Sequence, residues 1–432
     1  MGNNGAVNAE ALKGQKLALG TGHSVAIDRC QICGSEDLQP VAFFGYMPPV
    51  NEMCAVDSVP EEQPSYPLGL LHCGNCELVQ IGLSIDPVVL FPPSYPYTSG
   101  TTRILRENFA DLARQCADVI GLKSDDLIVD IGSNDGTLLS NFASNHRVLG
   151  IEPTDVGGIA RDRGIDTLQR YFSHEVAKEV RQSYGTAKVV TAANCFAHIE
   201  NVHPIVEGIL ELISDDGVFV SESHYLIGLL DTLQYDTVYH EHLRHYTVRS
   251  LANLLGMHGL EVFHVEKIPT HGGSIRVFAA RKGTYPVRES VATILAEEPE
   301  GAAMVERLDR FRQDVLMTKL GLTSILNDIK EKGERVVGIS APSRASTLVN
   351  YVGLDDATID YVCEIKGSLK IGKYMPGTRI PIVEESRLFE DQPDYALMLS
   401  WHIANELMPK LREKGFKGRF IVPLPEPLVV EF

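Results

Sequence analysis

The densest group of chemically active side chains lies near the middle of the chain. Within eight positions the sequence has Tyr239, His240, Glu241, His242, His245 and Tyr246. An unperturbed imidazole titrates at a pH of about 6.5, so such a group is suited to proton transfer at neutral pH. The segment lacks the His-Glu-x-x-His spacing of zinc hydrolases, which disfavours a catalytic metal. We therefore expect a proton-transfer site here.

Two pairs of cysteines near the N-terminus have the spacing of a metal site. Cys30 and Cys33 form one Cys-x-x-Cys turn and Cys73 and Cys76 form the other, whereas the remaining four cysteines are single. Each turn brings two thiolates within reach of one ion, so the pairs predict a tetrahedral Zn2+ site. Redox pairs or a chance spacing are the alternatives. With four protein ligands the zinc would be closed to substrate and therefore structural.

A glycine-rich turn follows a buried apolar segment at residues 127–131. That segment has the pattern of a parallel strand and a helix starts after the turn, so we expect a nucleotide-type turn of an α/β sheet. The turn lacks the Gly-x-Gly-x-x-Gly pattern of dinucleotide folds, and its carboxylates would repel a pyrophosphate. They suit a ligand that presents an ammonium group or hydroxyls. The predicted contacts are Asp130, Gly132, Ser133, Asn134, Asp135 and Gly136.

Two further predicted strands end near this turn. The first ends in Glu152, at the spacing where a carboxylate accepts both ribose hydroxyls. The second, at 188–193, delivers Asn194. We expect Phe196 to pack near an adenine, and His198 either to face the substrate or to lie in the core. S-adenosylmethionine fits these groups, so the pattern predicts a class I methyltransferase domain, with a doubly wound domain for another ligand as the alternative.

The last third of the chain predicts a second α/β unit. Apolar residues recur at helical spacing over 303–332, and an apolar strand follows at 335–339. A turn of small residues that contains Ser343 and Arg344 then opens another helix. A helix N-terminus with hydroxyls and an arginine suits a pyrophosphate. Further strands are predicted at 359–362, 395–399 and 420–422.

The composition excludes several classes of protein. The chain has 432 residues, of which 44% are hydrophobic and 22% charged, unlike a disordered or coiled-coil sequence. Its length allows roughly two to four folded domains. No apolar run reaches the ~20 residues of a membrane span. The net charge of −18 disfavours nonspecific binding to nucleic acid or anionic membranes. We expect a cytoplasmic protein without nucleic-acid or membrane partners.

Several other short motifs accompany the cysteine pairs and the Tyr-His-Glu-His segment. They are Tyr-Pro-Tyr-Thr-Ser-Gly at 95–100, Ile-Gly-Ser-Asn-Asp-Gly-Thr at 131–137, Ile-Glu-Pro at 151–153, Asn-Cys-Phe-Ala-His-Ile at 194–199, His-Gly-Gly-Ser-Ile-Arg at 271–276 and Gly-Lys-Tyr-Met-Pro-Gly-Thr at 372–378. Together these motifs resemble the sugar C-methyltransferase family, which acts on nucleotide-linked 4-keto deoxyhexoses in deoxysugar biosynthesis. The resemblance covers nearly the whole chain after about residue 27.

The resemblance implies a zinc module, a class I methyltransferase domain with a Rossmann-like fold, and a second Rossmann-like domain that holds the sugar nucleotide. With the strand pattern it gives four segments. We expect a mobile lead-in at 1–26, the zinc-binding module at 27–92, the methyl-donor domain at 93–284 and the sugar-nucleotide domain at 285–432. We expect a monomer or a weak homo-oligomer.

The resemblance also assigns roles to side chains. The family's base falls on His242, its neighbouring tyrosine and glutamate on Tyr239 and Glu241, and its sheet-end histidine on His198. A ketone at C4 of the sugar acidifies the C3 proton, which His242 would remove, while Tyr239, Tyr97 or His198 would donate hydrogen bonds to the enolate oxygen. The carbanion would then attack the methyl group of the donor. The expected substrate contacts are Tyr95, Glu222, Ser343, Arg344, Lys373 and Tyr374.

Two segments depart from the family's pattern and leave other functions open. Residues 341–345 read Ala-Pro-Ser-Arg-Ala where many members have Gly-Ala-Pro-Ala-Lys-Gly, and residues 243–246 read Leu-Arg-His-Tyr in place of Phe-Ser-Tyr-Tyr. The sugar, the nucleotide and the choice between C3 and C5 therefore stay open. The alternatives are an O- or N-methyltransferase, a C-methyltransferase that also reduces the ketone, and a noncatalytic zinc scaffold. The lack of a Gly-x-Gly-x-x-Gly after residue 339 disfavours the reductase.

Overall fold

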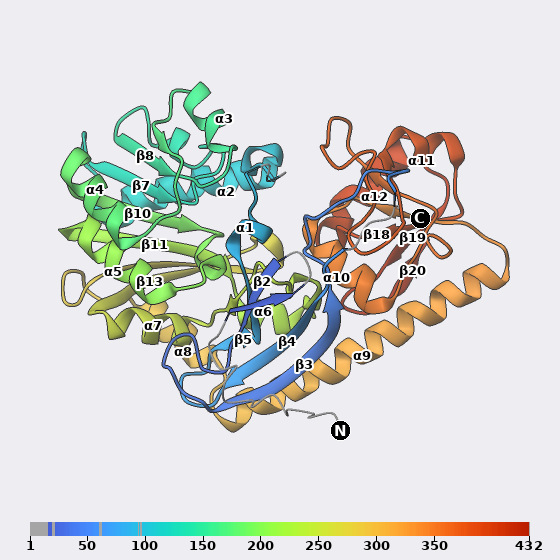
Figure 1. Ribbon diagram of the computed structural model, residues 1–432, viewed down its shortest axis with the longest axis horizontal. Coiled ribbons are helices and arrows are strands. Elements are labelled where there is room, and N and C mark those ends of the chain that lie inside the picture. Colours follow the sequence, from blue (N-terminus) through green and yellow to red (C-terminus); the bar gives the residue numbers. More distant parts are fainter. Residues whose placement is uncertain (1–15, 20–21, 60–62, 94, 96, 432) are drawn as a thin grey trace, which may run out of the picture.

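The structure, a computed structural model, describes residues 16–19, 22–59, 63–93, 95 and 97–431. Its elements form an N-terminal module, a central domain and a C-terminal domain (Figure 1). In the described part of the chain, no helix is both long and apolar enough to cross a bilayer.

The N-terminal module is built from short antiparallel strands. Its elements are β1 (Lys16–Leu19), β2 (Gly22–Ala26), β3 (Leu38–Met47), β4 (Tyr66–Cys73), β5 (Val79–Ile81), β6 (Leu83–Ile85) and α1 (Pro87–Leu90), joined by β12 (Arg244–His245) from far along the chain. One sheet has the order β12-β5-β4-β3 and a smaller one the order β1-β2-β6. Buried and half-buried residues alternate along β4, as expected for a strand with one face on the core.

The start of the chain differs from the predicted mobile lead-in. Residues 22–26 form β2, which pairs with β6 through Ser24 opposite Ile85, and β1 pairs with β2. These strands were not predicted because the partner strand β6 lies about sixty residues away and the segment has no clear alternation of its own. Residues 1–15 lie outside the described residues.

The central domain is a seven-stranded sheet that is buried on both faces. Its elements are α2 (Arg103–Cys116), β7 (Leu127–Ile131), β8 (Arg147–Ile151), α3 (Gly157–Asp162), β9 (Thr167–Leu168), α4 (His174–Tyr184), β10 (Ala187–Ala193), α5 (Val202–Leu212), β11 (Ile213–His224), α6 (Leu226–Asp231), α7 (Val248–Met257), β13 (Leu260–Ile268) and β14 (Ser274–Arg281). The order is β13-β14-β11-β10-β7-β8-β9, and β14 runs antiparallel to its neighbours. Ile128 and Val189 pack toward α2, whereas Val129 and Val190 join the core of the opposite face. Burial on both faces explains the continuous apolar runs of these strands.

The C-terminal domain is a second sheet of parallel strands with one antiparallel edge. Its elements are α8 (Glu289–Glu297), α9 (Ala302–Glu331), β15 (Val336–Ile339), α10 (Ser343–Val352), β16 (Val362–Glu364), β17 (Ile382–Glu384), α11 (Ser386–Asp391), β18 (Tyr395–Met398), α12 (Ala404–Glu413), β19 (Arg419–Val422) and β20 (Leu428–Val430). The order is β17-β16-β15-β18-β19-β20, with only β20 antiparallel. The strand expected at 359–362 is instead β16, displaced toward the C-terminus. The predicted pair of α/β domains is confirmed.

The N-terminal module contacts both larger domains. Figure 1 shows its blue strands between the green central domain and the red C-terminal domain, with α9 extending from β3 toward the latter. Because β12 completes the N-terminal sheet, the predicted boundary at residue 92 does not separate the two parts in space. Helix α9 buries one residue in every three or four along its length, from Met304 to Ile329.

Candidate active site

The four predicted zinc ligands meet at one point of the N-terminal module. Their Sγ atoms all lie within 4.8 Å of one another, with Cys30 and Cys76 3.4 Å apart and Cys33 and Cys73 3.6 Å apart. Four sulfurs about 2.3 Å from a tetrahedral zinc stand about 3.8 Å from each other. All four cysteines are free thiols, so the site fits Zn2+ with every coordination position taken by protein.

The zinc turn contacts the segment that follows the Tyr-His-Glu-His motif. The side chain of Gln31, between two ligands, accepts a hydrogen bond of 3.0 Å from the buried Arg244, and β12, which contains Arg244, pairs with β5. The adjacent Ile32 carbonyl accepts a bond of 2.8 Å from Nε2 of His203 in the central domain. A structural zinc site therefore lies against one end of the candidate catalytic loop.

Two carboxylates stand at the carboxyl ends of the central strands. Oε2 of Glu152 accepts the Asn134 N–H at 3.0 Å, and Oε1 accepts two bonds from Thr154. A carboxylate offers about four acceptor positions, so one remains for a ligand hydroxyl. Asp130 accepts a bond of 2.6 Å from Thr191, and burial raises the pKa of Asp130 to about 7.

The turn between these carboxylates leaves room for a ligand. Gly132 has a φ of 70°, and a Cβ there would lie 2.9 Å from Cβ of Cys195, so only glycine fits. The side-chain amide of Asn194 lies beside the Glu222 carboxylate, and within the described residues it makes no well-formed hydrogen bond. Together with Asp130 and Glu152, these groups fit the ammonium and ribose of S-adenosylmethionine. When bound, that group would supply an electrophilic methyl.

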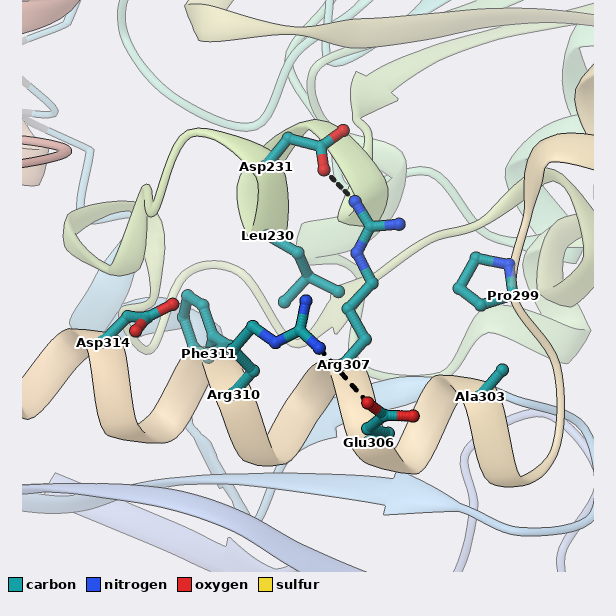
Figure 2. Close-up of a pocket in the computed structure, with 9 residues that line it drawn as sticks. All are labelled: Leu230, Asp231, Pro299, Ala303, Glu306, Arg307, Arg310, Phe311 and Asp314. Carbon is teal, nitrogen blue, oxygen red and sulfur yellow. Dashed lines mark hydrogen bonds and ion pairs between the residues drawn. The ribbon is translucent and has the colours of Figure 1, made fainter.

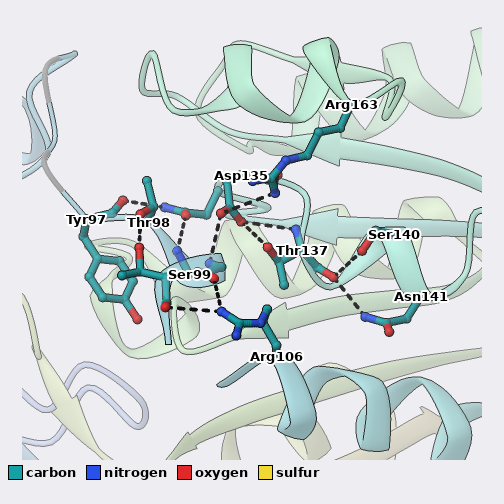
Figure 3. Close-up of polar contacts among 12 residues, drawn as sticks. Tyr97, Thr98, Ser99, Arg106, Asp135, Thr137, Ser140, Asn141 and Arg163 are labelled. Carbon is teal, nitrogen blue, oxygen red and sulfur yellow. Dashed lines mark hydrogen bonds and ion pairs between the residues drawn. The ribbon is translucent and has the colours of Figure 1, made fainter. Parts of the chain in front are cut away.

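Other predicted donor contacts are engaged within the protein. Asn134 accepts the Ser99 N–H at 2.8 Å and donates to the Tyr97 carbonyl at 3.2 Å, while Asp135 accepts the Gly100 N–H at 2.9 Å. Figure 3 shows these bonds, which fix residues 97–100 across the turn. Thr137 and Arg163 approach the same Asp135 carboxylate. The side chains of Asn134 and Asp135 therefore hold this segment, and their contact with the methyl donor stays a prediction.

Three further predicted donor contacts, Ser133, Gly136 and Phe196, are closely packed by the protein. A Cβ at Gly150 would lie 2.4 Å from Oγ of Ser133, and a Cβ at Gly136 would lie 2.9 Å from Ala160. Phe196 is fully buried, with its ring centroid 5.3 Å from that of Phe219 and 5.9 Å from that of Tyr246. An aromatic residue after a strand also suits the core, so the packing of Phe196 near an adenine stays a prediction.

His242 is held in one tautomer by the backbone. Its Nδ1 lies 2.6 Å from the Thr237 carbonyl. A carbonyl can only accept, so Nδ1 carries the proton and Nε2 keeps its lone pair. The side chain is buried, and burial together with the neighbouring His198 holds the pKa of His242 well below its usual value. At neutral pH His242 is a neutral imidazole that is ready to accept a proton.

Several aromatic side chains surround His242. Its ring centroid lies 4.0 Å from that of Tyr239, 4.8 Å from His224, 5.0 Å from His198 and 6.3 Å from His245. The His271 ring lies 5.3 Å beyond, next to His224. Burial lowers the pKa of His198, His245 and His271 to about 4. We call His198, His224, His242, His245 and His271 the imidazole cluster.

The neighbouring Glu241 joins all three parts of the molecule. Its Oε1 accepts a bond of 2.7 Å from Asn51 of the N-terminal module, and its Oε2 accepts a bond of 3.1 Å from the Tyr95 hydroxyl. Ser343, at the start of α10, donates to Asn51 at 2.9 Å. Burial raises the pKa of Glu241 to about 7. Tyr95 and Ser343, two predicted substrate contacts, thus belong to the network around Glu241.

Arg344, the predicted pyrophosphate ligand, is paired with an acid inside the protein. Its guanidinium makes two bonds of 2.7 Å to Asp236, one of 3.1 Å to Gln234, and stacks over the Trp401 ring at 5.1 Å. Asp236 therefore balances its charge and ties α10 to the central domain. Sequence analysis missed this pair because its members are more than a hundred residues apart.

Glu222 is likewise a structural group. It is fully buried, where it accepts bonds of 3.0 Å from Arg276 and 2.5 Å from Asn108. Two guanidinium nitrogens of Arg276 contact the same oxygen of Glu222 and fix β11 against β14. The predicted contact of Glu222 with substrate stays a prediction. The other two predicted substrate contacts lie between the N-terminal module and the C-terminal domain. Lys373 bridges to Ala55, and the Tyr374 hydroxyl accepts the Asp57 N–H at 3.3 Å.

The structure also brings residues to the site that sequence analysis did not select. His224 ends β11 and His271 opens the His-Gly-Gly-Ser-Ile-Arg motif, so a histidine beside a strand end was the available signal. Asn51 lies in the proline-rich stretch between the cysteine pairs, where nothing marked it. Lys370 donates to the Ala341 carbonyl at 2.6 Å, near Glu241, and is a cation at the turn where Arg344 was expected.

An open groove of about 430 Å3 shares no residue with the imidazole cluster. It lies between α6 and the start of α9 (Figure 2). Its charged side chains pair with one another, Arg307 with Asp231 and Arg310 with Glu306 at 3.2 Å. We assign no ligand to it.

Comparisons with known proteins agree with this arrangement. Residues 30–91 match the family model of a zinc binding domain, residues 102–265 that of a methyltransferase domain, and residues 269–425 that of a C-methyltransferase C-terminal domain. C-methyltransferase NovU from Streptomyces niveus is 36% identical over 411 residues, which cover 94% of this chain and 97% of the relative.

Two solved structures are similar to less than half of the chain. A methyltransferase from Clostridium acetobutylicum is 10% identical, with a TM-score of 0.33, over 41% of this chain and 92% of its own. Magnesium protoporphyrin IX methyltransferase from Synechocystis is 12% identical, with a TM-score of 0.32, over 41% and 79%. The assignment rests instead on the full-length relative and the three domain matches. This chain therefore belongs to the C-methyltransferase family that includes NovU, and it is an S-adenosylmethionine-dependent C-methyltransferase with a zinc-binding module.

Proposed function

We propose that this enzyme methylates a nucleotide-linked 4-keto deoxysugar on the carbon next to the ketone, C3. The observation that carries the proposal is His242, a buried neutral imidazole with Nδ1 committed to Thr237 and Nε2 free. Carbon becomes a nucleophile only after it loses a proton, and a fixed base next to a methyl-donor domain supplies that step.

Tyr239 supports the step as a hydrogen-bond donor to the enolate oxygen. Its ring lies 4.0 Å from that of His242. Burial and the neighbouring Glu241 hold the pKa of Tyr239 well above its usual value, so the phenol keeps its proton. A donor fixed before the reaction stabilises developing negative charge without reorganisation.

The C-terminal domain supports a nucleotide-linked substrate. Ligands of open α/β sheets bind at the carboxyl ends of the strands. At that end of β15 and β16 lie Ser343, Glu364 and Lys370, and Ser343 connects through Asn51 to Glu241. We assign the cation for the diphosphate to Lys370, because Arg344 is paired with Asp236. The sugar would then reach from this sheet to the imidazole cluster.

The test is product analysis with nucleoside diphosphate sugars that carry a ketone at C4. Donor with a deuterated methyl group marks the product by mass, and NMR locates the new methyl group on C3 or C5. We expect a C3-methylated keto sugar, and no product from the matched sugar with a hydroxyl at C4. A methyl group on oxygen or nitrogen, or equal methylation of the hydroxyl sugar, would refute the proposal.

A further inference from the structure

Carbon methylation leaves one proton in the buried site at every turnover. The C–H bond breaks, a C–C bond to the methyl group forms, and the sulfonium donor becomes a neutral thioether, so one proton must be released. His242, which accepts this proton in the proposed function, is only 4% exposed. It must lose the proton before the next cycle, and it has little direct access to solvent.

Other members of the imidazole cluster lead from His242 toward the surface. His224 is 4.8 Å from His242 between ring centroids, and His271 is 5.3 Å from His224. His224 and His271 are both partly exposed, whereas His242 is buried. Rings at this separation exchange protons through a small rotation or one bridging water.

We propose that His224 accepts the proton from His242 and passes it through His271 to solvent. The N–H bond at Nε2 of His242 breaks and an N–H bond forms on His224, which restores the neutral base. The same exchange moves the proton to His271 and then to a buffer molecule. These steps transfer only a proton and change no oxidation state, so they need no further reactant. The inference rests on the proposed function, because it begins with a proton on His242.

The surroundings of His224 favour passage of the proton over its storage. The titratable and charged groups that face it are His242, His271, His245 and Arg344, and burial together with these groups keeps its pKa well below the usual value. A cationic His224 would therefore lose its proton quickly. None of these four groups carries a negative charge that would trap it.

The backbone at His271 is held in an uncommon conformation. Its φ is 55°, in the left-handed region. Two contacts hold this turn, one of 3.5 Å from Arg344 to the His271 carbonyl and one of 2.6 Å from Gln234 to the Gly272 carbonyl. Strain that neighbouring side chains impose is typical of a residue whose orientation matters for function.

His198 offers the competing route on another side of His242. Its ring lies 5.0 Å from that of His242 and stacks on Phe91 at 5.7 Å. An exit through His198 would leave His224 without a part in turnover. If the proton leaves through His224, turnover of the His224 variants should depend on added proton acceptors. If it leaves through His198, turnover of the His198 variant should depend on them.

The test is the buffer dependence of turnover in His224→Ala. We expect its kcat to fall roughly tenfold or more in dilute buffer. Added imidazole should restore kcat, with little change in KM for the sugar nucleotide. Wild type and His258→Ala, a control at the His203–His258 pair outside the imidazole cluster, should not respond to imidazole. His224→Gln, which keeps most of the side-chain volume, replaces His224→Ala if the latter does not fold.

Solvent exchange gives a second measurement that does not depend on methyl transfer. In deuterated water with the demethylated donor bound, wild type should wash deuterium into C3. The His224 variants should exchange much more slowly, because the proton on His242 returns to carbon. The relay would be overturned if His224→Ala and His224→Gln kept the wild-type kcat and did not depend on imidazole. It would also be overturned if imidazole rescued His198→Asn alone. Either result would leave C-methylation intact. Absence of C-methylated product from wild type would overturn the proposed function and the relay together.

Discussion

Two regions of this enzyme gather side chains of the kinds that bind metals, and only one of them is built as a metal site. In the zinc turn, four Sγ atoms lie within 4.8 Å of one another. In the imidazole cluster, the rings around His242 stand 4.8 to 6.3 Å away between centroids, and Nδ1 of His242 already donates to a carbonyl. Within the described residues, only the cysteines converge closely enough to bind an ion.

The difference shows that geometry and prior hydrogen bonds decide the chemistry of such groups. The cysteine site has no open position and stabilises a small module with short strands. The imidazole cluster keeps lone pairs available and is neutral, which suits repeated proton transfer. The two regions are also joined, because Gln31 in the zinc turn contacts Arg244 just after the catalytic motif.

Removal of a zinc ligand tests the zinc turn and should have the largest effect on stability and activity. Structural zinc contributes on the order of 10 kcal/mol to folding in small zinc-finger peptides. We expect Cys73→Ser to lose its zinc by elemental analysis, to lower the melting temperature and to abolish methylation, since β12 would lose its partner. Cys54→Ser, a cysteine outside the zinc turn, should keep one zinc per chain. Full activity of Cys73→Ser without zinc would show that the module does not support the loop.

Replacement of His242, the proposed base, tests the imidazole cluster. We expect His242→Asn to lose both methylation and deuterium exchange at C3 by about a hundredfold to ten-thousandfold, because general base catalysis has that magnitude. Calorimetry should show unchanged binding of the nucleotide sugar. The adjacent His240→Asn is the control, since Nε2 of His240 donates to the Pro67 carbonyl at 3.2 Å and its ring packs on Tyr66. A His242→Asn protein that still exchanges would move the base to His198 or Tyr239.

The sequence predicts those features that local spacing encodes, and it does not reveal contacts between distant elements. The cysteine turns and the strand-end Glu152 are encoded within a few residues, and so is the apolar pattern of both sheets. The engagement of Arg344 by Asp236, and of Glu222 by Arg276, depends on contacts between separate elements. Phe196 is a different case, because a buried aromatic residue and one that stacks on a ligand have the same local pattern.

Glu152 lies at the site proposed for the methyl donor, where one acceptor position of its carboxylate remains for a ligand hydroxyl. We expect Glu152→Ala to weaken S-adenosylmethionine binding about ten- to a hundredfold, the loss of one charge-assisted hydrogen bond of about 1.5 to 3 kcal/mol. Because Glu152 also holds Thr154 and Asn134, Glu152→Gln separates charge from shape. Calorimetry should rank wild type above Gln and Gln above Ala. Wild-type affinity in both variants would place the ribose elsewhere.

The smallest effect concerns Glu241, a buried acid that keeps its proton where exposed acids lose theirs. Burial raises its pKa from 4.5 to about 7. Between these pH values the folded protein binds a proton that the unfolded chain has released, so this group makes stability fall as pH rises through that range. Glu241→Gln cannot ionise and should lack this fall.

The measurement is chemical unfolding of wild type and Glu241→Gln at pH 5 and pH 8. We expect similar free energies of unfolding at pH 5, and a relative gain for the variant at pH 8 on the order of 1 to 3 kcal/mol. Asp130, whose pKa is also raised to about 7, is present in both proteins and cancels. If the free energies of unfolding of the two proteins differ by the same amount at both pH values, Glu241 is ionised at both. That result would place a negative charge beside the imidazole cluster, where the raised pKa predicts a proton.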